Sequence, residues 1–131
     1  MKTENIKFRG KSKKTGEWLY GDLEYNRKKD IARIHSYDDE GEYIGQQEVD
    51  KETIGQFTGL YDESGKAVYE GDLLSGYGNN VIEVVWLDAG FCDCNSNTIV
   101  SLRELDVEDQ KVIGNIYDNK ELLTQEYEKI D

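Results

Sequence analysis

Proline is absent from this chain, cysteine occurs twice, histidine occurs once, and no apolar run approaches the roughly 20 residues that span a bilayer. The first residues, MKTENIKFRGK, lack the apolar stretch of a secretory signal. Cys92 and Cys94 are too close in sequence for an unstrained disulfide. We therefore expect no membrane segment and no disulfide scaffold, and we expect a location in a reducing cytoplasm.

Aromatic residues are well represented, with 2 Trp, 9 Tyr and 3 Phe among 131 residues, although the hydrophobic fraction is only 37%. Large rings can build a core from few residues, so the composition is that of a folded chain. The length predicts a single domain over residues 1–131. Two sub-modules are an alternative within it: an N-terminal β region over residues 1–50, and a barrel-like region with a C-terminal helix over residues 51–131.

Short runs rich in β-branched and aromatic residues lie between glycine-containing turns, which is typical of strands. The runs that we interpret as strands are Glu17–Glu24, Ile31–Tyr37, Glu42–Val49, Ile54–Tyr61, Ala67–Tyr69, Val81–Leu87, Gly90–Cys94, Thr98–Arg103 and Lys111–Tyr117. The order of turns and strands from Tyr69 to Leu87 is similar to that of SH3-like barrels. We predict a mainly β fold, formed by a small SH3-like barrel or a bent sheet, with an N-terminal hairpin region.

One C-terminal α-helix completes this prediction. Asp118 is followed three residues later by Glu121, the arrangement of a capping box. Apolar residues then recur at helical spacing, at Leu122, Leu123, Tyr127 and Ile130. We expect this apolar face to pack against the sheet.

Three blocks of sequence resemble the YopX-type proteins of phages and prophages. They are IKFRGKSKKTGEWLYGDL near the start, IGQFTGLYDESGKAVYEGDLL in the middle and VIGNIYDNKELL near the end. The resemblance implies an accessory phage or prophage protein with a β-rich fold, in the cytoplasm of a bacterial host cell. It implies no activity and supplies no catalytic residues.

The residues themselves do not indicate an enzyme. Cys92 and Cys94 lack the second ligand pair of a structural zinc site, so we interpret them as two small buried side chains. His35 has no serine or cysteine nucleophile in a recognisable motif, and the acidic clusters at residues 38–42 and 106–109 do not match a calcium loop. We predict no catalytic residues, no metal site and no cofactor.

Charge gives the clearest binding signal. Residues 1–33 hold 10 Lys/Arg and 5 Asp/Glu, a net of +5, whereas the remaining residues hold 6 and 23, a net of −17. Aromatic residues lie among the lysines, and the binding residues that we predict are Lys11, Lys13, Lys14, Trp18 and Tyr20. A charge distribution of this kind can steer partners.

The leading hypothesis is a non-enzymatic protein-interaction module whose partner is an unknown host or phage protein, or a second copy of this chain. The alternative is a nucleic-acid-directed protein. In that case the basic N-terminal arm contacts DNA or RNA, or the acidic body mimics DNA and binds a host DNA-binding protein. A net charge of −12 makes direct nucleic-acid binding the weaker hypothesis, because phosphates are repelled.

Overall fold

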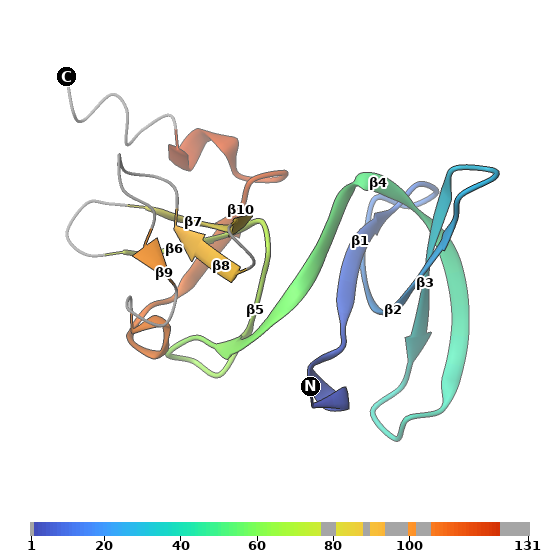
Figure 1. Ribbon diagram of the computed structural model, residues 1–131, viewed down its shortest axis with the longest axis horizontal. Helices are drawn as coiled ribbons and strands as arrows, with labels where there is room; N and C mark the ends of the chain where they lie inside the picture. Colours follow the sequence, from blue (N-terminus) through green and yellow to red (C-terminus); the bar gives the residue numbers. More distant parts are fainter. Residues whose placement is uncertain (1, 77–80, 88–89, 94–99, 102–105, 124–131) are drawn as a thin grey trace. The chain divides into compact units, whose positions relative to one another are not determined.

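The computed structural model describes residues 2–76, 81–87, 90–93, 100–101 and 106–123. The chain divides into two compact units, Met1–Phe57 and Thr58–Asp131, which we call the N-terminal unit and the C-terminal unit (Figure 1). The division falls seven residues beyond the sub-module boundary at residue 50 that we predicted from the sequence.

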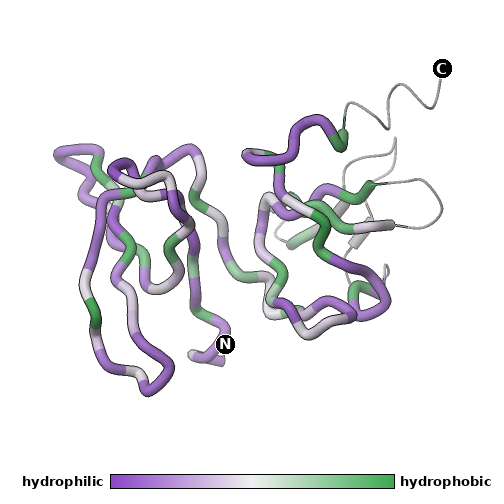
Figure 2. The backbone as a smooth tube through the Cα atoms, turned by 180° about the vertical axis from the view of Figure 1, so that it is seen from behind, coloured by the Kyte–Doolittle hydropathy of each residue, from purple (hydrophilic) through white to green (hydrophobic). Residues whose placement is uncertain are grey.

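The N-terminal unit is an antiparallel sheet with a short 3-10 helix, η1 (Thr3–Asn5), before it. Its strands are β1 (Phe8–Ser12), β2 (Trp18–Asn26), β3 (Ile31–Tyr37) and the first part of β4 (Tyr43–Tyr61). Consecutive strands pair, and β1 also pairs with β4, so the sheet bends back on itself. The turns between these strands are hydrophilic (Figure 2).

Alternation along the strands places every second side chain inside the bend. The inward residues form one apolar cluster, which consists of Ala32, Ile34 and Val49 with Phe8, Leu19, Leu23 and Ile54 packed against them. Intervening residues of β2 and β3 therefore lie on the opposite side of the sheet.

Strand β2 changes neighbours at Gly21, which pairs with Phe8 of β1, while the next residue, Asp22, pairs with His35 of β3. Gly21 has a φ of 153°, and a Cβ atom at this position would lie 1.9 Å from the backbone oxygen of His35. Only glycine allows the two backbones to approach this closely. The bend of the sheet therefore depends on a residue without a side chain.

The C-terminal unit contains the end of β4 paired with β5 (Ala67–Tyr69), and a second sheet. The strands of this sheet lie in the order β10-β6-β7-β8-β9, and all its pairs are antiparallel. Their bounds are β6 (Asp72–Leu74), β7 (Ile82–Leu87), β8 (Gly90–Asp93), β9 (Val100–Ser101) and β10 (Val112–Asn115), with a 3-10 helix, η3 (Val107–Asp109), before β10. The core of this unit is formed by Val68, Leu74, Ile82, Val84 and Val107.

The C-terminal helix is present but begins later than predicted. Residues 120–123 are helical, and Asn119 rather than Asp118 precedes the first helical residue. Asn119 accepts a hydrogen bond from the backbone N–H of Asn115 at 3.1 Å, which ties the start of the helix to the end of β10. Leu122 and Leu123 are half-buried, and Tyr127 and Ile130 lie outside the described residues.

The predicted fold class is confirmed: the protein is mainly β, with bent antiparallel sheets and a C-terminal helix that begins at residue 120. In the described part of the chain, no helix is long and apolar enough to cross a membrane.

Candidate functional site

The side of the N-terminal sheet opposite its apolar cluster carries a dense group of aromatic and charged side chains. Cross-strand pairs place Arg9 opposite Tyr20, Lys11 opposite Trp18, and Asp22 opposite His35. Since directly paired residues project to the same side of a sheet, the side chains of these pairs form one surface across β1, β2 and β3. We call this surface the outer face; its residues are Arg9, Lys11, Trp18, Tyr20, Asp22, Glu24, Arg33, His35, Tyr37, Tyr43 and Glu48.

Trp18 lies at one end of the outer face, and two cations contact its ring. The guanidinium carbon of Arg9 is 4.6 Å from the ring centroid, and the ammonium nitrogen of Lys11 is 5.4 Å from it. Both distances are those of cation–π contacts. Arg9 is buried, with 4% of its surface exposed, so the indole ring and this guanidinium form a fixed platform.

Three tyrosines extend the aromatic surface beyond this platform. Tyr20, Tyr37 and Tyr43 are 45%, 44% and 52% exposed. The rings of Tyr37 and Tyr43 meet edge to face with centroids 5.6 Å apart. The Tyr37 hydroxyl donates a hydrogen bond to Asp22 Oδ2 at 2.9 Å, and this bond raises the pKa of Tyr37. The rings of Tyr37 and Tyr43 are therefore held in place while their surfaces face solvent.

His35 lies between a carboxylate and a hydroxyl. Its Nε2 atom is 2.7 Å from Glu24 Oε1, and its Nδ1 atom is 3.1 Å from the hydroxyl of Tyr43. Arg33 adds an ion pair to Glu24 at 3.6 Å. A carboxylate–imidazole–hydroxyl series can relay a proton, but here it ends on a tyrosine that is half exposed, and its evident effect is to fix the ring of Tyr43.

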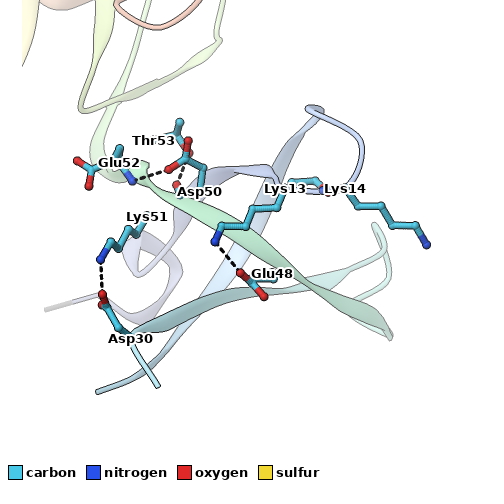
Figure 3. Close-up of polar contacts among 9 residues, drawn as sticks. Lys13, Lys14, Asp30, Glu48, Asp50, Lys51, Glu52 and Thr53 are labelled. Carbon is cyan, nitrogen blue, oxygen red and sulfur yellow. Dashed lines mark hydrogen bonds and ion pairs between the residues drawn. The ribbon is translucent and has the colours of Figure 1, made fainter. Parts of the chain in front are cut away.

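Of the predicted lysines in the β1–β2 turn, Lys13 extends toward Glu48 of β4, and Lys14 extends in a different direction (Figure 3). Lys13 forms an ion pair of 2.8 Å with Glu48, and this contact raises the pKa of Lys13. Lys14 is exposed in the same turn. Further along β4, Lys51 pairs with Asp30, and the bonds that Asp30 accepts from Lys51 and Tyr25 lower its pKa.

A bulge in β4 begins after Glu48 and includes Lys51. Arg9 pairs with Gly55 but Lys11 pairs with Asp50, so β4 contains extra residues opposite β1. The hydroxyl of Thr53 accepts the N–H of Lys11 at 2.9 Å and donates to the backbone oxygen of Asp50 at 2.6 Å. This buried side chain thus supplies the bonds that the ladder loses at the bulge.

The structure divides the binding residues predicted from the sequence into two places. It brings Lys11, Trp18 and Tyr20 together on the outer face and leaves Lys13 and Lys14 in the turn at the end of β1. Sequence reasoning missed Glu24 of β2, and it missed the contribution of β3 and β4 to this face, namely His35, Tyr37 and Tyr43. The spacing of Arg33, His35 and Tyr37 at every second position was the available signal, because it marks one side of a strand.

The other candidate sites have structural explanations where they are described. In the first acidic cluster, Asp38 Oδ1 accepts the N–H groups of Glu40 and Glu42, each at 2.9 Å, which closes the β3–β4 turn. The second cluster lies in and next to η3. Cys94 lies outside the described residues, and in the described part of the chain no three His, Cys, Asp or Glu side chains gather in a way that could hold a metal ion.

These features define a small, mainly β protein with an aromatic and charged outer face on its N-terminal unit. The family model described as YopX protein matches residues 7–124, which includes β1 and the start of the C-terminal helix, so the chain belongs to the YopX family. No curated protein is significantly similar to it.

Proposed function

We propose that this protein is a non-enzymatic interaction module that binds another protein through the outer face. The observation that carries the proposal is the presence of Tyr20, Tyr37 and Tyr43, each about half exposed, on one side of a unit whose apolar cluster is on the other side. Rings at such positions are not required for the core. Tyrosine, tryptophan and arginine are the residue types most enriched among the side chains that dominate protein–protein binding energy.

The contacts that fix the side chains of the outer face support the same proposal. Asp22 holds Tyr37, His35 lies against Tyr43, and Arg9 and Lys11 contact Trp18. Side chains that are already fixed before binding lose less conformational entropy when a partner binds. The outer face is therefore suited to a rigid contact with a protein surface.

The charges of the outer face favour a protein over a nucleic acid. Arg9, Lys11 and Arg33 are its cations, and Asp22, Glu24 and Glu48 are its anions. Three positive and three negative charges give no net attraction for a phosphate backbone, which dominates affinity for nucleic acids. The platform of Arg9 and Trp18 suits base stacking, but the carboxylates of the same face oppose such a ligand.

Two observations support the rest of the proposal: the chain belongs to the YopX family, and its two cysteines are too close in sequence for an unstrained disulfide. The protein acts as an accessory factor of a phage or prophage in the bacterial cytoplasm, on a host or phage protein. The outer face holds no cofactor in this proposal.

Comparative capture from a bacterial lysate tests the proposal. Immobilised wild-type protein is compared with a Tyr20→Ser, Tyr37→Ser double variant and with Ile113→Ser, whose side chain is a comparably exposed apolar one in the C-terminal unit. We expect one or more proteins to be retained by the wild type and by Ile113→Ser, and to fall at least about tenfold with the double variant. Equal retention by all three, at unchanged melting temperatures, would show that the outer face is not the binding surface. Retained nucleic acid that the double variant loses would favour the alternative function.

A further inference from the structure

One edge of β4 has backbone groups that point away from the sheet. The backbone N–H of Lys13 donates to the oxygen of Glu48 at 3.0 Å, so this carbonyl is directed away from β3 and toward β1. In an antiparallel ladder, alternate residues direct both backbone groups to the same edge. The N–H and C=O of Gln46 therefore also point away from β3.

Strand β1 leaves this edge before it reaches Gln46. The Ser12 hydroxyl accepts the N–H groups of Lys14 and Thr15, each at 3.2 Å, and Gly16, with a φ of 76°, completes the turn. Within the N-terminal unit as described, no strand pairs with residues 44–47 on the edge opposite β3. An unpaired edge of this kind is a template for another strand.

Two hollows lie along the same stretch of β4, and both include Gln46 and Gln47. Glu48, which lines one hollow, belongs to the outer face, and Leu19, which lines the other, packs against the apolar cluster, so space is available on both sides of the edge. The larger hollow, about 700 Å³, is lined by Lys13, Lys14, Thr15, Gln46, Gln47 and Glu48. The smaller, about 200 Å³, is lined by Leu19, Ser36, Ile44, Gly45, Gln46 and Gln47.

The two hollows differ in chemistry. In the larger one, Lys13 and Lys14 bring two positive charges against the single carboxylate of Glu48, which leaves an excess of positive charge. In the smaller one, Leu19 and Ile44 supply an apolar surface, and Ile44 is 65% exposed. A ligand that satisfies both must present acidic and apolar groups in alternation.

We propose that residues 44–47 of β4 bind an extended acidic peptide segment of another protein as an added β-strand. Its backbone bonds to Gln46 and continues the place of β1 in the sheet. Its side chains alternate, with a carboxylate in the hollow beside Lys14 and an apolar group in the hollow beside Ile44. In strand addition, backbone bonds supply affinity and pockets for alternate side chains supply specificity.

This inference deepens the proposed protein-binding function, on which it rests, but it uses the β4 edge beside Glu48 rather than the tyrosines of the outer face. The two can be separated, because Tyr20 and Tyr37 do not line either hollow. A segment that binds the β4 edge must therefore remain bound when these tyrosines are replaced.

A labelled synthetic peptide tests the proposal directly. The probe alternates Val and Asp over about ten residues, and the control peptide alternates Val and Lys; binding is followed by fluorescence anisotropy at low salt. Gln46→Pro removes the glutamine side chain and an N–H that points away from the sheet, and Gln46→Ala removes the side chain alone. We expect the Val/Asp peptide to bind the wild type, Gln46→Ala and the Tyr20→Ser, Tyr37→Ser variant alike, and to bind Gln46→Pro at least about tenfold more weakly.

A charge reversal provides a second readout that does not depend on tolerance of proline. Lys14→Glu should weaken binding of the Val/Asp peptide by about tenfold and improve binding of the Val/Lys peptide. Three results would overturn the proposal. The first is no binding of the Val/Asp peptide to the wild type, and the second is equal affinity of this peptide for the wild type and for folded Gln46→Pro. The third is a wild-type dimer that Gln46→Pro converts to a monomer without any change in the affinity for the peptide.

Discussion

Asp62 is buried at the start of the turn that joins β4 to β5, where it connects this turn to β10. Its Oδ1 atom accepts the N–H of Ser64, the hydroxyl of Ser64 and the N–H of Lys66 at 2.8 to 2.9 Å. Its Oδ2 atom accepts the N–H of Val112, at the start of β10, at 2.9 Å. Burial raises the pKa of this carboxyl, but the four hydrogen bonds outweigh burial and lower it to about 2.

The lowered pKa of Asp62 makes stability depend on pH in a defined direction. A carboxyl whose pKa is about 2 in the folded state and about 3.9 in the unfolded state contributes about 2–3 kcal/mol above pH 5. This contribution is lost as the pH falls from about 4 to about 2. We expect urea unfolding to show that loss in the wild type and a smaller loss in Asp62→Asn. Parallel pH profiles for the two proteins would mean that the hydrogen bonds of Asp62 do not favour its ionised form.

Among the elements, β3 and β4 show what local sequence can and cannot predict. The run Ile31–Tyr37 was predicted with the bounds that the structure has, because alternation between Ala32 and Ile34 and their polar neighbours is a local signal. Two strands, Glu42–Val49 and Ile54–Tyr61, were predicted where one strand, β4, runs from Tyr43 to Tyr61. The polar residues between them suggested a break, but Thr53 bonds to Lys11 in β1, 42 positions away in sequence.

The same limit applies to the site. The proximity of Lys11 to Trp18 could be predicted, since a short turn joins their strands. The contact between Glu24 and His35 depends on the β2–β3 register, which places Leu23 opposite Ile34, and that register is set by the turn and by both strands together, not by the pattern of either strand alone. For the same reason the sequence alone could not place Tyr43 against His35.

The β4 bulge yields a prediction about Thr53. Thr53→Val keeps the shape of the side chain and removes the hydroxyl, which deprives the N–H of Lys11 and the oxygen of Asp50 of this partner. We expect the free energy of unfolding to fall by about 1–3 kcal/mol, because both groups are in a partly buried region. Thr15→Val is the matched control: its hydroxyl also accepts a backbone N–H, from Glu17, but it is exposed, and the expected loss is below about 0.5 kcal/mol. Equal losses in urea denaturation would refute a special role for the bulge.

At the scale of the whole molecule, the two units divide the charge differently from the sequence split at residue 33. That split gave a basic first quarter and an acidic remainder. Residues 1–57 hold 11 Lys/Arg and 12 Asp/Glu, a net of −1, and residues 58–131 hold 5 and 16, a net of −11. The basic residues near the start fold together with acidic ones, as the Lys13–Glu48 and Arg33–Glu24 pairs show. The N-terminal unit is thus nearly neutral, which suits a protein partner better than a nucleic acid.

The proposed protein-binding function requires that the outer face contacts a protein. Site-specific photo-crosslinking tests this claim directly: p-benzoylphenylalanine replaces Tyr37 on the outer face or, in a separate protein, Ile113 of β10, and each protein is irradiated in bacterial cells. We predict a discrete protein adduct from position 37 and none of the same mass from position 113, because only the former lies on the outer face. Adducts to nucleic acid at position 37, or the same protein adduct from both positions, would contradict the account.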